Sequence, residues 1–258
     1  MNMHVLSDDF LALDYVKVIK KITAFISNEV KSRKKSGVVI GLSGGLDSSV
    51  CLVLASRTLQ ANKISGLIMP EKGLTPKTDI QNAKILAKKL NIRYMVIDIK
   101  QGKKILLNRL PKDKLSAGNF SARVRMSLLY YYAAVHNLLV LGTADKSELM
   151  IGYFTKFGDA GADMFPIGEL YKSQVRLLAK ELQLPEGIIR QPSSPRFWKG
   201  QLAESEIGLS YADIDRILDS YQKKNLNHCK LNKKKIKLVT DMIIKSQHKK
   251  EKAPVGKY

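Results

Sequence analysis

The chain has 258 residues, 45% of them hydrophobic and 26% charged, a balance typical of a folded globular protein. It carries 44 Lys and Arg against 23 Asp and Glu, a formal net charge of +21, and only two cysteines, Cys51 and Cys229. This composition excludes a disulfide scaffold and a structural zinc site, and the chain has no apolar run of about 18 residues that could span a membrane. Asp8 and Asp9 stand where a signal peptide needs apolar residues, and the low cysteine count favours a reducing compartment, so we expect a cytoplasmic protein.

Strand and helix patterns alternate from residue 38 to residue 142. Short continuous apolar runs predict strands that are buried on both faces, and apolar residues at helical spacing predict the helices between them. The expected strands are 38–42, 64–69, 94–97 and 138–141, and the expected helices begin near residues 46 and 80 and cover 122–135. This order predicts an α/β fold with a mainly parallel sheet flanked by helices.

After residue 142 the pattern becomes mostly helical, with helices expected at 172–182, 211–221 and 231–246. We therefore expect one domain over 1–258, with an α/β core at about 37–190 and a helical C-terminal segment at about 205–248. Two stretches rich in Pro, Gly, Ser and charge, 70–77 and 191–200, are expected to be mobile covers of an active site.

The basic surplus is concentrated near the C-terminus, where residues 223–258 contain 12 Lys and two acids. The lysines alternate with apolar residues, which favours one amphipathic helix with a solvated face. A contact with phosphate or with nucleic acid remains an alternative explanation of this charge.

The most specific local motif is the nine-residue segment from Gly41 to Ser49, GLSGGLDSS, between a buried strand and a helix. Such a turn directs backbone N–H groups and the positive end of the helix to one point, which forms a cradle for an anion. Hydroxyls of Ser43, Ser48 and Ser49 can donate to phosphate oxygens, and Asp47 can hold Mg²⁺ against the same phosphates. The alternative is a plain capped turn in which Ser43 or Asp47 serves as the N-cap.

The SGGLDSS segment resembles the pyrophosphate loop of the ATP pyrophosphatase superfamily, whose members adenylate an acceptor and release pyrophosphate. Further motifs follow in order: SARVRM at 121–126, GTADKSE at 142–148, GYFTKFGDAGAD at 152–163 and PIGELYK at 166–172. Together they resemble ammonia-dependent NAD(+) synthetases from about residue 38 to residue 248. The sequence departs from the family pattern at Ala144-Asp145, Ala160 and Ala203. The resemblance implies an adenine nucleotide alpha hydrolase-like fold, a Rossmann-like arrangement of three layers.

The resemblance also implies the site. Asp47 and Glu148 would bind Mg²⁺, and Asp47 and Lys172 would act on the reacting phosphates. The implied ATP-binding residues are Gly41, Leu42, Ser43, Gly44, Gly45, Leu46, Asp47, Ser48, Thr143, Lys172 and Ser194. The implied contacts to deamido-NAD are Arg123, Lys156, Asp163, His248 and Lys249. Taken singly, each of these side chains could instead be a solvated charge, a cap or a surface pair.

The implied reaction is amidation of deamido-NAD to NAD in two steps, through an adenylated carboxylate with release of pyrophosphate and then AMP. Asp159 is our candidate for the group that takes a proton from ammonium. Since 37 residues precede the first expected strand and Cys51 is expected in the core, we expect free ammonia as the nitrogen donor unless a separate glutaminase subunit supplies it. The family further implies a homodimer with the dinucleotide at the interface.

Two alternatives remain. Another ATP pyrophosphatase, such as a tRNA-modifying or amidating ligase, shares the SGGLDSS loop and would suit the positive charge. A nucleic-acid binder would use the basic C-terminus but would leave Asp47 and Glu148 unexplained. We therefore expect small-molecule substrates, and neither a membrane nor a nucleic acid as a partner.

Overall fold

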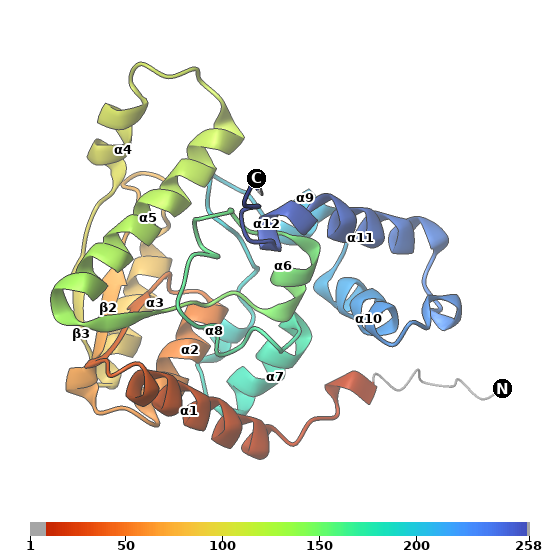
Figure 1. The fold of residues 1–258 in the computed structure, drawn as a ribbon, viewed down its shortest axis with the longest axis horizontal. Helices are drawn as coiled ribbons and strands as arrows, with labels where there is room; N and C mark the ends of the chain where they lie inside the picture. Colours follow the sequence, from red (N-terminus) through yellow and green to blue (C-terminus); the bar gives the residue numbers. More distant parts are fainter. Residues whose placement is uncertain (1–8, 257–258) are drawn as a thin grey trace.

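Four parallel strands form the sheet in the computed structural model, which describes residues 9–256 (Figure 1). The order is β3-β2-β1-β4, and the strands are β1 (Gly37–Gly41), β2 (Ile64–Ile68), β3 (Arg93–Val96) and β4 (Leu138–Leu141). β1 pairs with β2 and β4, and β2 pairs with β3, always in parallel. All four expected strands are thus confirmed to within one or two residues, as is the α/β class.

Strands β1, β2 and β4 are buried on both faces, as their continuous apolar sequences predict. In β1, Val38 and Ile40 point into one core while Val39 points into the other. β4 repeats the alternation, with Leu139 and Leu141 on the first side and Leu138 and Val140 on the second. The period of two residues therefore divides these strands between two hydrophobic cores.

Helices cover both faces of the sheet. The first face packs against residues from five helices: α1 (Tyr15–Ser32), α2 (Leu46–Ser56), α3 (Lys77–Lys89), α7 (Lys172–Glu181) and α8 (Glu186–Ile189). The second face packs against α5 (Lys114–His136), and α4 (Lys100–Leu107) lies beside it (Figure 1). The result is the three-layer arrangement expected from the sequence.

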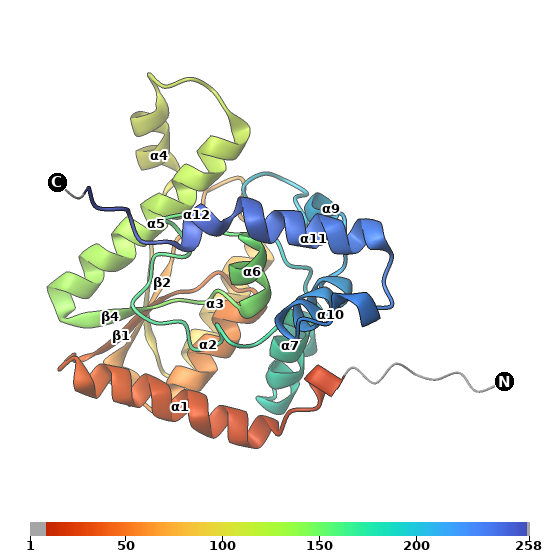
Figure 2. The ribbon, with the colours of Figure 1, turned by 45° about the vertical axis from the view of Figure 1, so that its right-hand side comes forward.

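A separate hydrophobic core joins the C-terminal helices to the α/β part. It lies among α6 (Lys146–Ile151), α9 (Ala203–Ile207), α10 (Tyr211–Gln222) and α11 (Lys233–Lys245), with α12 (Gln247–Lys250) continuing from α11 (Figure 2). Three short 3₁₀ turns complete the described elements, at Asp9–Leu11, Ala61–Lys63 and Leu226–His228. The C-terminal helices therefore pack against α6 and α7, the two helices that follow β4 in the chain.

The basic C-terminal segment forms the amphipathic helix that its spacing predicts. Val239 and Ile243 of α11 are buried, whereas Lys237 is exposed and pairs with Asp241 one turn away at 2.9 Å. The helices expected at 46, 80, 122–135, 172–182 and 211–221 are confirmed, although α5 begins eight residues earlier than predicted. No helix within residues 9–256 combines the length and apolarity that a membrane span requires.

The strand order determines where a ligand site can form. The chain moves outward from β1 through β2 to β3, and then returns to place β4 on the other side of β1. The segments that leave the carboxyl ends of β1 and β4 therefore diverge, and such a switch point opens a crevice at that edge of the sheet. The GLSGGLDSS and GTADKSE motifs follow β1 and β4 respectively, so both lie at this crevice.

Candidate active site

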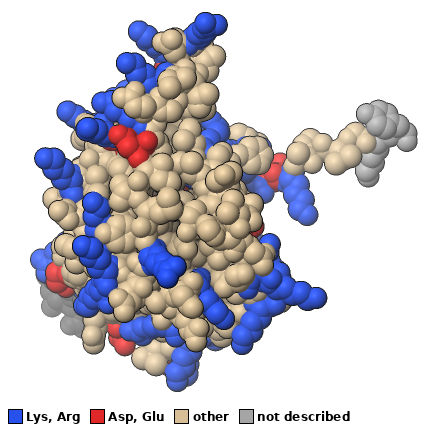
Figure 3. Space-filling model, turned by 90° about the vertical axis from the view of Figure 1, so that its left-hand side faces the viewer, with Lys and Arg blue, Asp and Glu red and all other residues tan. Residues whose placement is uncertain are grey.

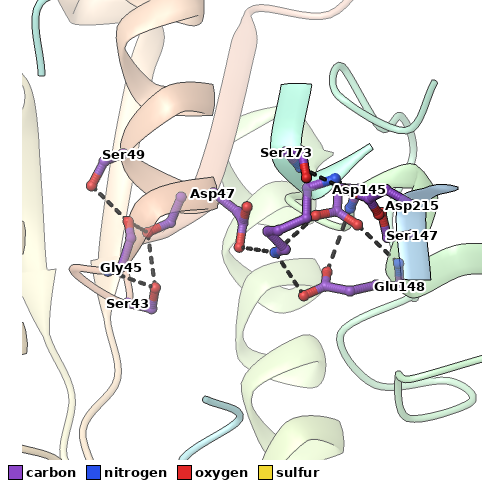
Figure 4. Close-up of polar contacts among 11 residues, drawn as sticks. Ser43, Gly45, Asp47, Ser49, Asp145, Ser147, Glu148, Ser173 and Asp215 are labelled. Atoms are coloured by element: carbon purple, nitrogen blue, oxygen red, sulfur yellow. Dashed lines mark hydrogen bonds and ion pairs between the residues drawn. The ribbon is translucent and has the colours of Figure 1, made fainter. Parts of the chain in front are cut away.

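The loop after β1 is organised by its own polar groups before any ligand is bound. The Ser43 and Ser48 hydroxyls lie 2.9 Å apart, and the Ser49 hydroxyl donates to the carbonyl of Gly45 at 2.8 Å (Figure 4). Gly45 is the N-cap residue of α2 and offers no side chain to the first N–H groups of that helix. The positive end of α2 is consequently available to an anion at the mouth of the loop.

Gly44 is required at its position for two independent reasons. Its φ of +79° lies in the left-handed region, and a Cβ there would lie 1.9 Å from the carbonyl oxygen of Asp79 in α3. A side chain would therefore strain the turn and also push α3 away from the loop. The second glycine of the pair, Gly45, meets neither restriction, since its φ is −88° and its nearest neighbour would be the Ser43 hydroxyl at 3.4 Å.

The ammonium group of Lys172 lies among three carboxylates at the centre of the crevice (Figure 4). Its Nζ is 2.7 Å from Asp47 of α2, 2.8 Å from Asp145 and 2.9 Å from Glu148 of α6. The Lys172 and Asp145 side chains are completely buried, while those of Asp47 and Glu148 are about one-fifth exposed, at 22% and 20%. The structure thus brings Asp47, Glu148 and Lys172 together, as the resemblance implied.

Asp145 is a member of this cluster that sequence reasoning treated only as a departure from the family pattern. It is the N-cap of α6, where its side chain accepts from the N–H of Glu148 at 2.8 Å in a capping box with the Glu148 side chain. The segment Asp145-Lys146-Ser147-Glu148 has the acid-x-x-Glu spacing of a capping box, so the sequence did contain a signal for this helix start.

The cluster contains more negative than positive charge, and the pKa values respond to this. Burial raises the pKa of Asp145 to about 6 even though the Lys172 ammonium opposes the shift. Burial likewise raises the pKa of Glu148 well above its ordinary value, again against the effect of Lys172. Burial alone would lower the pKa of Lys172, but Asp145, Asp47 and Glu148 outweigh it and raise that pKa. Lys172 therefore stays protonated among carboxylates that lack a full complement of positive charge.

A cavity of about 300 Å³ opens beside the cluster, within the range of volumes found for small-molecule sites. Its walls include the phosphate loop from Gly41 to Asp47, except Gly44, and also Thr143, Glu148, Asp159 and Ser194. Segments 70–77 and 191–200 both contribute to the lining, which agrees with their expected position as covers. Most of the predicted ATP-binding residues therefore line this cavity, whereas Gly44, Ser48 and Lys172 do not.

The cover at 191–200 is fastened to α3 by one buried carboxylate. Asp79 accepts from Gln191 Nε2 at 2.8 Å and from Arg196 Nε at 3.0 Å. Within the cover, the Ser194 hydroxyl donates to the carbonyl of Gln201 at 2.6 Å and accepts from the Arg196 N–H at 3.1 Å. Because the backbone carbonyl of Asp79 also lies close to Gly44, the cover and the phosphate loop contact the same residue.

The cover at 70–77 is held by α4 and α5. Glu71 accepts two hydrogen bonds from Lys103 Nζ, at 3.0 and 2.9 Å, and one from the Ser121 hydroxyl at 3.1 Å. Nearby, Arg125 of α5 donates from Nε to the carbonyl of Met69 at 2.9 Å and lines the cavity. Arg125 belongs to the SARVRM motif but was not among the predicted site residues.

Asp159 also lines the cavity. One of its oxygens accepts from the Thr155 N–H at 2.7 Å, and desolvation raises the pKa of its carboxyl despite that hydrogen bond. A carboxylate whose pKa is shifted toward neutrality is a better proton acceptor than an ordinary one at neutral pH. The position and the pKa direction both suit the proton-transfer function predicted from the sequence.

The residues predicted to contact deamido-NAD do not line this cavity. Arg123 Nε donates to the carbonyl of Lys156 at 3.2 Å, and Lys156 Nζ donates to the carbonyl of His248 at 2.6 Å. Lys249 Nζ donates hydrogen bonds to the carbonyls of Gly152 and Phe154, at 2.8 and 3.0 Å. The C-terminal segment is therefore attached to the loop after α6. Asp163 is separate: it accepts from the Val140 N–H at 2.7 Å, at the edge of β4.

The donor set of the cluster fits a magnesium ion. Asp47 Oδ1 is buried without a hydrogen-bond partner among the described residues, and carboxylate oxygens are the ligands that Mg²⁺ prefers. Within residues 9–256, no three His, Cys, Asp and Glu side chains form a ready-made metal site. Mg²⁺ does not need one, because it is commonly held by one or two carboxylates together with phosphate oxygens and waters.

Neither cysteine belongs to the ion cluster or lines the cavity. Cys51 of α2 is fully buried, as predicted, and both cysteines are free thiols. Burial raises the pKa of the Cys51 thiol well above its ordinary value, which leaves it an inert core residue.

The fold and the site together define an α/β nucleotide-binding protein with a Ser/Gly phosphate loop at the switch point of a parallel sheet. A family model described as NAD synthase matches residues 18–253. The NH(3)-dependent NAD(+) synthetase of Hyperthermus butylicus is 44% identical over 261 residues, covering 98% of this chain and 94% of that protein. The chain belongs to the NAD synthase family, which confirms the resemblance seen in the sequence.

Solved structures agree with this assignment and with the expected fold. NMN synthetase from Francisella tularensis has a TM-score of 0.87, and NH3-dependent NAD synthetase from Campylobacter jejuni, in complex with the nitrate ion, has 0.84. Each is 33% identical to this chain, and each comparison covers 95% of this chain and 100% of the other.

Replacing Lys172 with Met keeps most of the side-chain volume but leaves the cluster without its ammonium. We expect K172M to lower the free energy of unfolding at pH 8 by about 3 kcal/mol, as when one partner of a buried ion pair is removed. Without Lys172 the carboxyl pKa values rise further, and Asp145 starts from about 6. A carboxyl whose pKa is raised in the folded state stabilises the folded protein at low pH. This contribution to the free energy of unfolding is lost as the pH rises through the folded-state pKa.

The deficit of K172M relative to the parent should therefore shrink between pH 8 and pH 5, as measured by urea-induced unfolding. Lys237→Met, which removes an exposed pair, is the matched control and should cost less than about 1 kcal/mol at both pH values. A deficit of equal size at pH 5 and pH 8 would contradict the charge assignment.

Proposed function

We propose that this chain is an ammonia-dependent ligase that forms a C–N bond, amidating deamido-NAD to NAD with consumption of ATP. The observation that carries the proposal is the buried Lys172 with its three carboxylates beside the phosphate loop, in a member of the NAD synthase family. The names of the curated relatives support ammonia as the nitrogen donor.

In the first step, an oxygen of the nicotinate carboxylate attacks the α-phosphorus of ATP, and the bond to the β-phosphate oxygen breaks. Gly41–Ser48 would hold the phosphates through backbone N–H groups, the serine hydroxyls and the N-terminus of α2. Lys172, fixed and protonated, would neutralise the charge that develops on the departing pyrophosphate, and Thr143 would contact ATP from the end of β4. The protein acts here by positioning and charge neutralisation.

In the second step, the nitrogen lone pair of ammonia attacks the adenylated carbonyl carbon, and the bond to the AMP oxygen breaks. The nucleophile must be neutral, so ammonium has to lose a proton before attack. Asp159, with its raised pKa and its place in the cavity wall, is the base we propose for that proton. Closed covers at 70–77 and 191–200 would keep water from the adenylate, and Ser194 would contact ATP from the second cover.

Asp47 and Glu148 would bind Mg²⁺ together with the phosphates. The ion would supply charge neutralisation of the triphosphate, which the surplus of negative charge around Lys172 requires. Asp47 Oδ1 would be available to bind the ion, because this oxygen accepts no hydrogen bond from the described residues.

Arg123, Lys156, Asp163, His248 and Lys249 would contact deamido-NAD on the open side of the cavity. Arg123 and His248 are exposed, so a second copy of the chain could complete this part of the site. A face suited to that copy lies on β3, α4 and α5, where large apolar side chains are exposed: Met95, Val96, Ile105, Leu106, Leu110, Leu115, Tyr131 and Val135. Figure 3 shows uncharged surface across much of this side, with Lys and Arg distributed around it.

The direct test supplies purified protein with Mg-ATP and deamido-NAD and offers either ammonium or glutamine. NAD and AMP should form in equal amounts with ammonium and not with glutamine. A second arm replaces deamido-NAD with nicotinate mononucleotide, because one similar structure is an NMN synthetase. Preference for the mononucleotide would reassign the acceptor, and no pyrophosphate release with either acceptor would overturn the ligase assignment.

Replacing Asp47 with Asn should reduce pyrophosphate release by ~100-fold or more and weaken Mg²⁺-dependent ATP binding in calorimetry, since the charged ligand is lost. Glu169→Gln is the control, because Glu169 is a 95% exposed carboxylate close to Lys172 in sequence and its removal should leave both quantities unchanged. If D47N binds Mg-ATP as tightly as the parent, the metal assignment is wrong.

Replacing Arg196 with Ala removes one of the two bonds from the cover to Asp79. We expect the ratio of AMP to NAD formed to rise by about two-fold or more, because a looser cover admits water to the adenylate. Arg190→Ala is the matched control, since Arg190 is exposed and pairs only with Glu186 among the described contacts. Equal product ratios in parent, R190A and R196A would argue against a water-excluding function of this cover.

The homodimer proposal has its own measurement. Sedimentation equilibrium at micromolar concentration should give the mass of two chains. Replacing Tyr131, 73% exposed on α5, with Glu should shift the mass toward one chain, because a charge would be buried in the interface. A single-chain mass for the parent would contradict the proposal.

A further inference from the structure

Asp215 is a buried acid outside the cavity that the proposed chemistry does not use. It lies on α10 with no solvent exposure, in the helical C-terminal part of the chain. One carboxylate oxygen accepts from the Ser147 hydroxyl, and the other accepts from the N–H of Ser173 at 2.8 Å (Figure 4). Burying a carboxylate away from water costs considerable free energy, so its hydrogen bonds indicate which groups it stabilises.

The Ser147 hydroxyl connects Asp215 to Lys172. Its oxygen accepts from the backbone N–H of Lys172 at 2.9 Å, so its own proton is left to donate to Asp215. Lys172 and Ser173 are the first two residues of α7, whose N–H groups have no partner within the helix. Ser147 and Asp215 therefore satisfy the N-terminal donors of α7 at the residue that carries the ammonium.

The same helix also contacts the other end of the Lys172 side chain. Tyr211 lies one turn before Asp215 on α10, and its ring centroid is 5.2 Å from Lys172 Nζ. Asp215 thus acts on the backbone of Lys172 through Ser147, while Tyr211 packs beside the ammonium. A flexible lysine held at both ends has few alternative rotamers, which is the condition for a charge to be preorganised.

We propose that Asp215 and Ser147 form a positioning relay, a chain of hydrogen bonds that holds Lys172 in place beside Asp47 and the phosphate loop. The relay rests on the proposed function, because Lys172 acts on the ATP phosphates there. It also joins three helices: Ser147 belongs to α6 beside Asp145 and Glu148, Lys172 begins α7, and Asp215 belongs to α10. Helix α10 then contributes to adenylation without touching the substrate.

Replacement of Asp215 with Asn keeps the shape but gives one of the two positions an N–H donor. Ser173 N–H and the Ser147 proton both need acceptors, so the amide satisfies one and opposes the other. We expect D215N to lower kcat for pyrophosphate release by ~10–100-fold, the usual loss when a supporting hydrogen bond to an active-site group is removed. KM for ATP and for deamido-NAD should stay within about threefold, because the binding contacts remain.

The matched control is Asp219→Asn, the same change one turn later on α10, where Asp219 pairs with Lys223 at the surface. D219N should retain parental kcat. Rates are compared per folded protein at a temperature well below unfolding, so lost stability alone does not change kcat. Ser147→Ala removes the middle of the relay and should reproduce the loss in kcat, which keeps the proposal testable if D215N does not fold.

A double-mutant cycle gives the last discrimination. If Asp215 and Ser147 act as one relay, S147A/D215N should lose no more in kcat than the worse single variant, whereas independent structural effects would multiply. Parental kcat in both single variants, or multiplicative losses in the double variant, would overturn the relay while leaving the proposed function intact. A parent without activity on any acceptor would remove the basis of both.

Discussion

The ion cluster around Lys172 is the interaction on which the rest of the site depends. It contains Asp47 from the helix after β1, Asp145 and Glu148 from the start of the helix after β4, and Lys172, the first residue of α7. It therefore joins segments separated by up to 125 residues. A buried charge that loses one partner destabilises a protein strongly, so these segments cannot move apart independently. The segments that follow β1 and β4 are therefore joined by charge as well as by apolar packing.

The charge cluster is also incomplete, and this incompleteness connects the fold to the chemistry. Three carboxylates surround one ammonium, and burial raises the pKa of Asp145 and of Glu148. Such a cluster would repel a bare triphosphate. It would accept one that arrives with a divalent cation, because the cation supplies the missing positive charge. Under the proposed function, the same electrostatics would stabilise the empty site poorly and the loaded site well.

Much of the fold could be predicted because its signals are local. The continuous apolar strands, the Ser/Gly turn and the amphipathic spacing of α11 each follow from a few neighbouring residues. Helix α1 was not predicted, although Ile19, Ile22, Ile26 and Val30 have helical spacing and Asp14 caps the helix. Asp215 is different, since nothing near it in sequence indicates Ser147 or Ser173, 68 and 42 residues away. Buried polar contacts between distant segments depend on tertiary packing, which periodicity does not report.

The positive charge of the chain has a more specific meaning in three dimensions than in composition. Lys249 and Lys250 donate to backbone carbonyls of α6 and of the loop after it, and Lys156 of that loop donates to the carbonyl of His248, so part of the basic tail is structural. The chain as a whole carries a net charge of +21, which attracts polyanions over a Debye length of about 8 Å at physiological salt. ATP and a dinucleotide would thus be attracted to a positively charged surface and would then bind beside the cluster of carboxylates around Lys172. Attraction at the surface would then be general for anions, whereas entry to the cluster would require the cation, and selectivity would arise at the second stage.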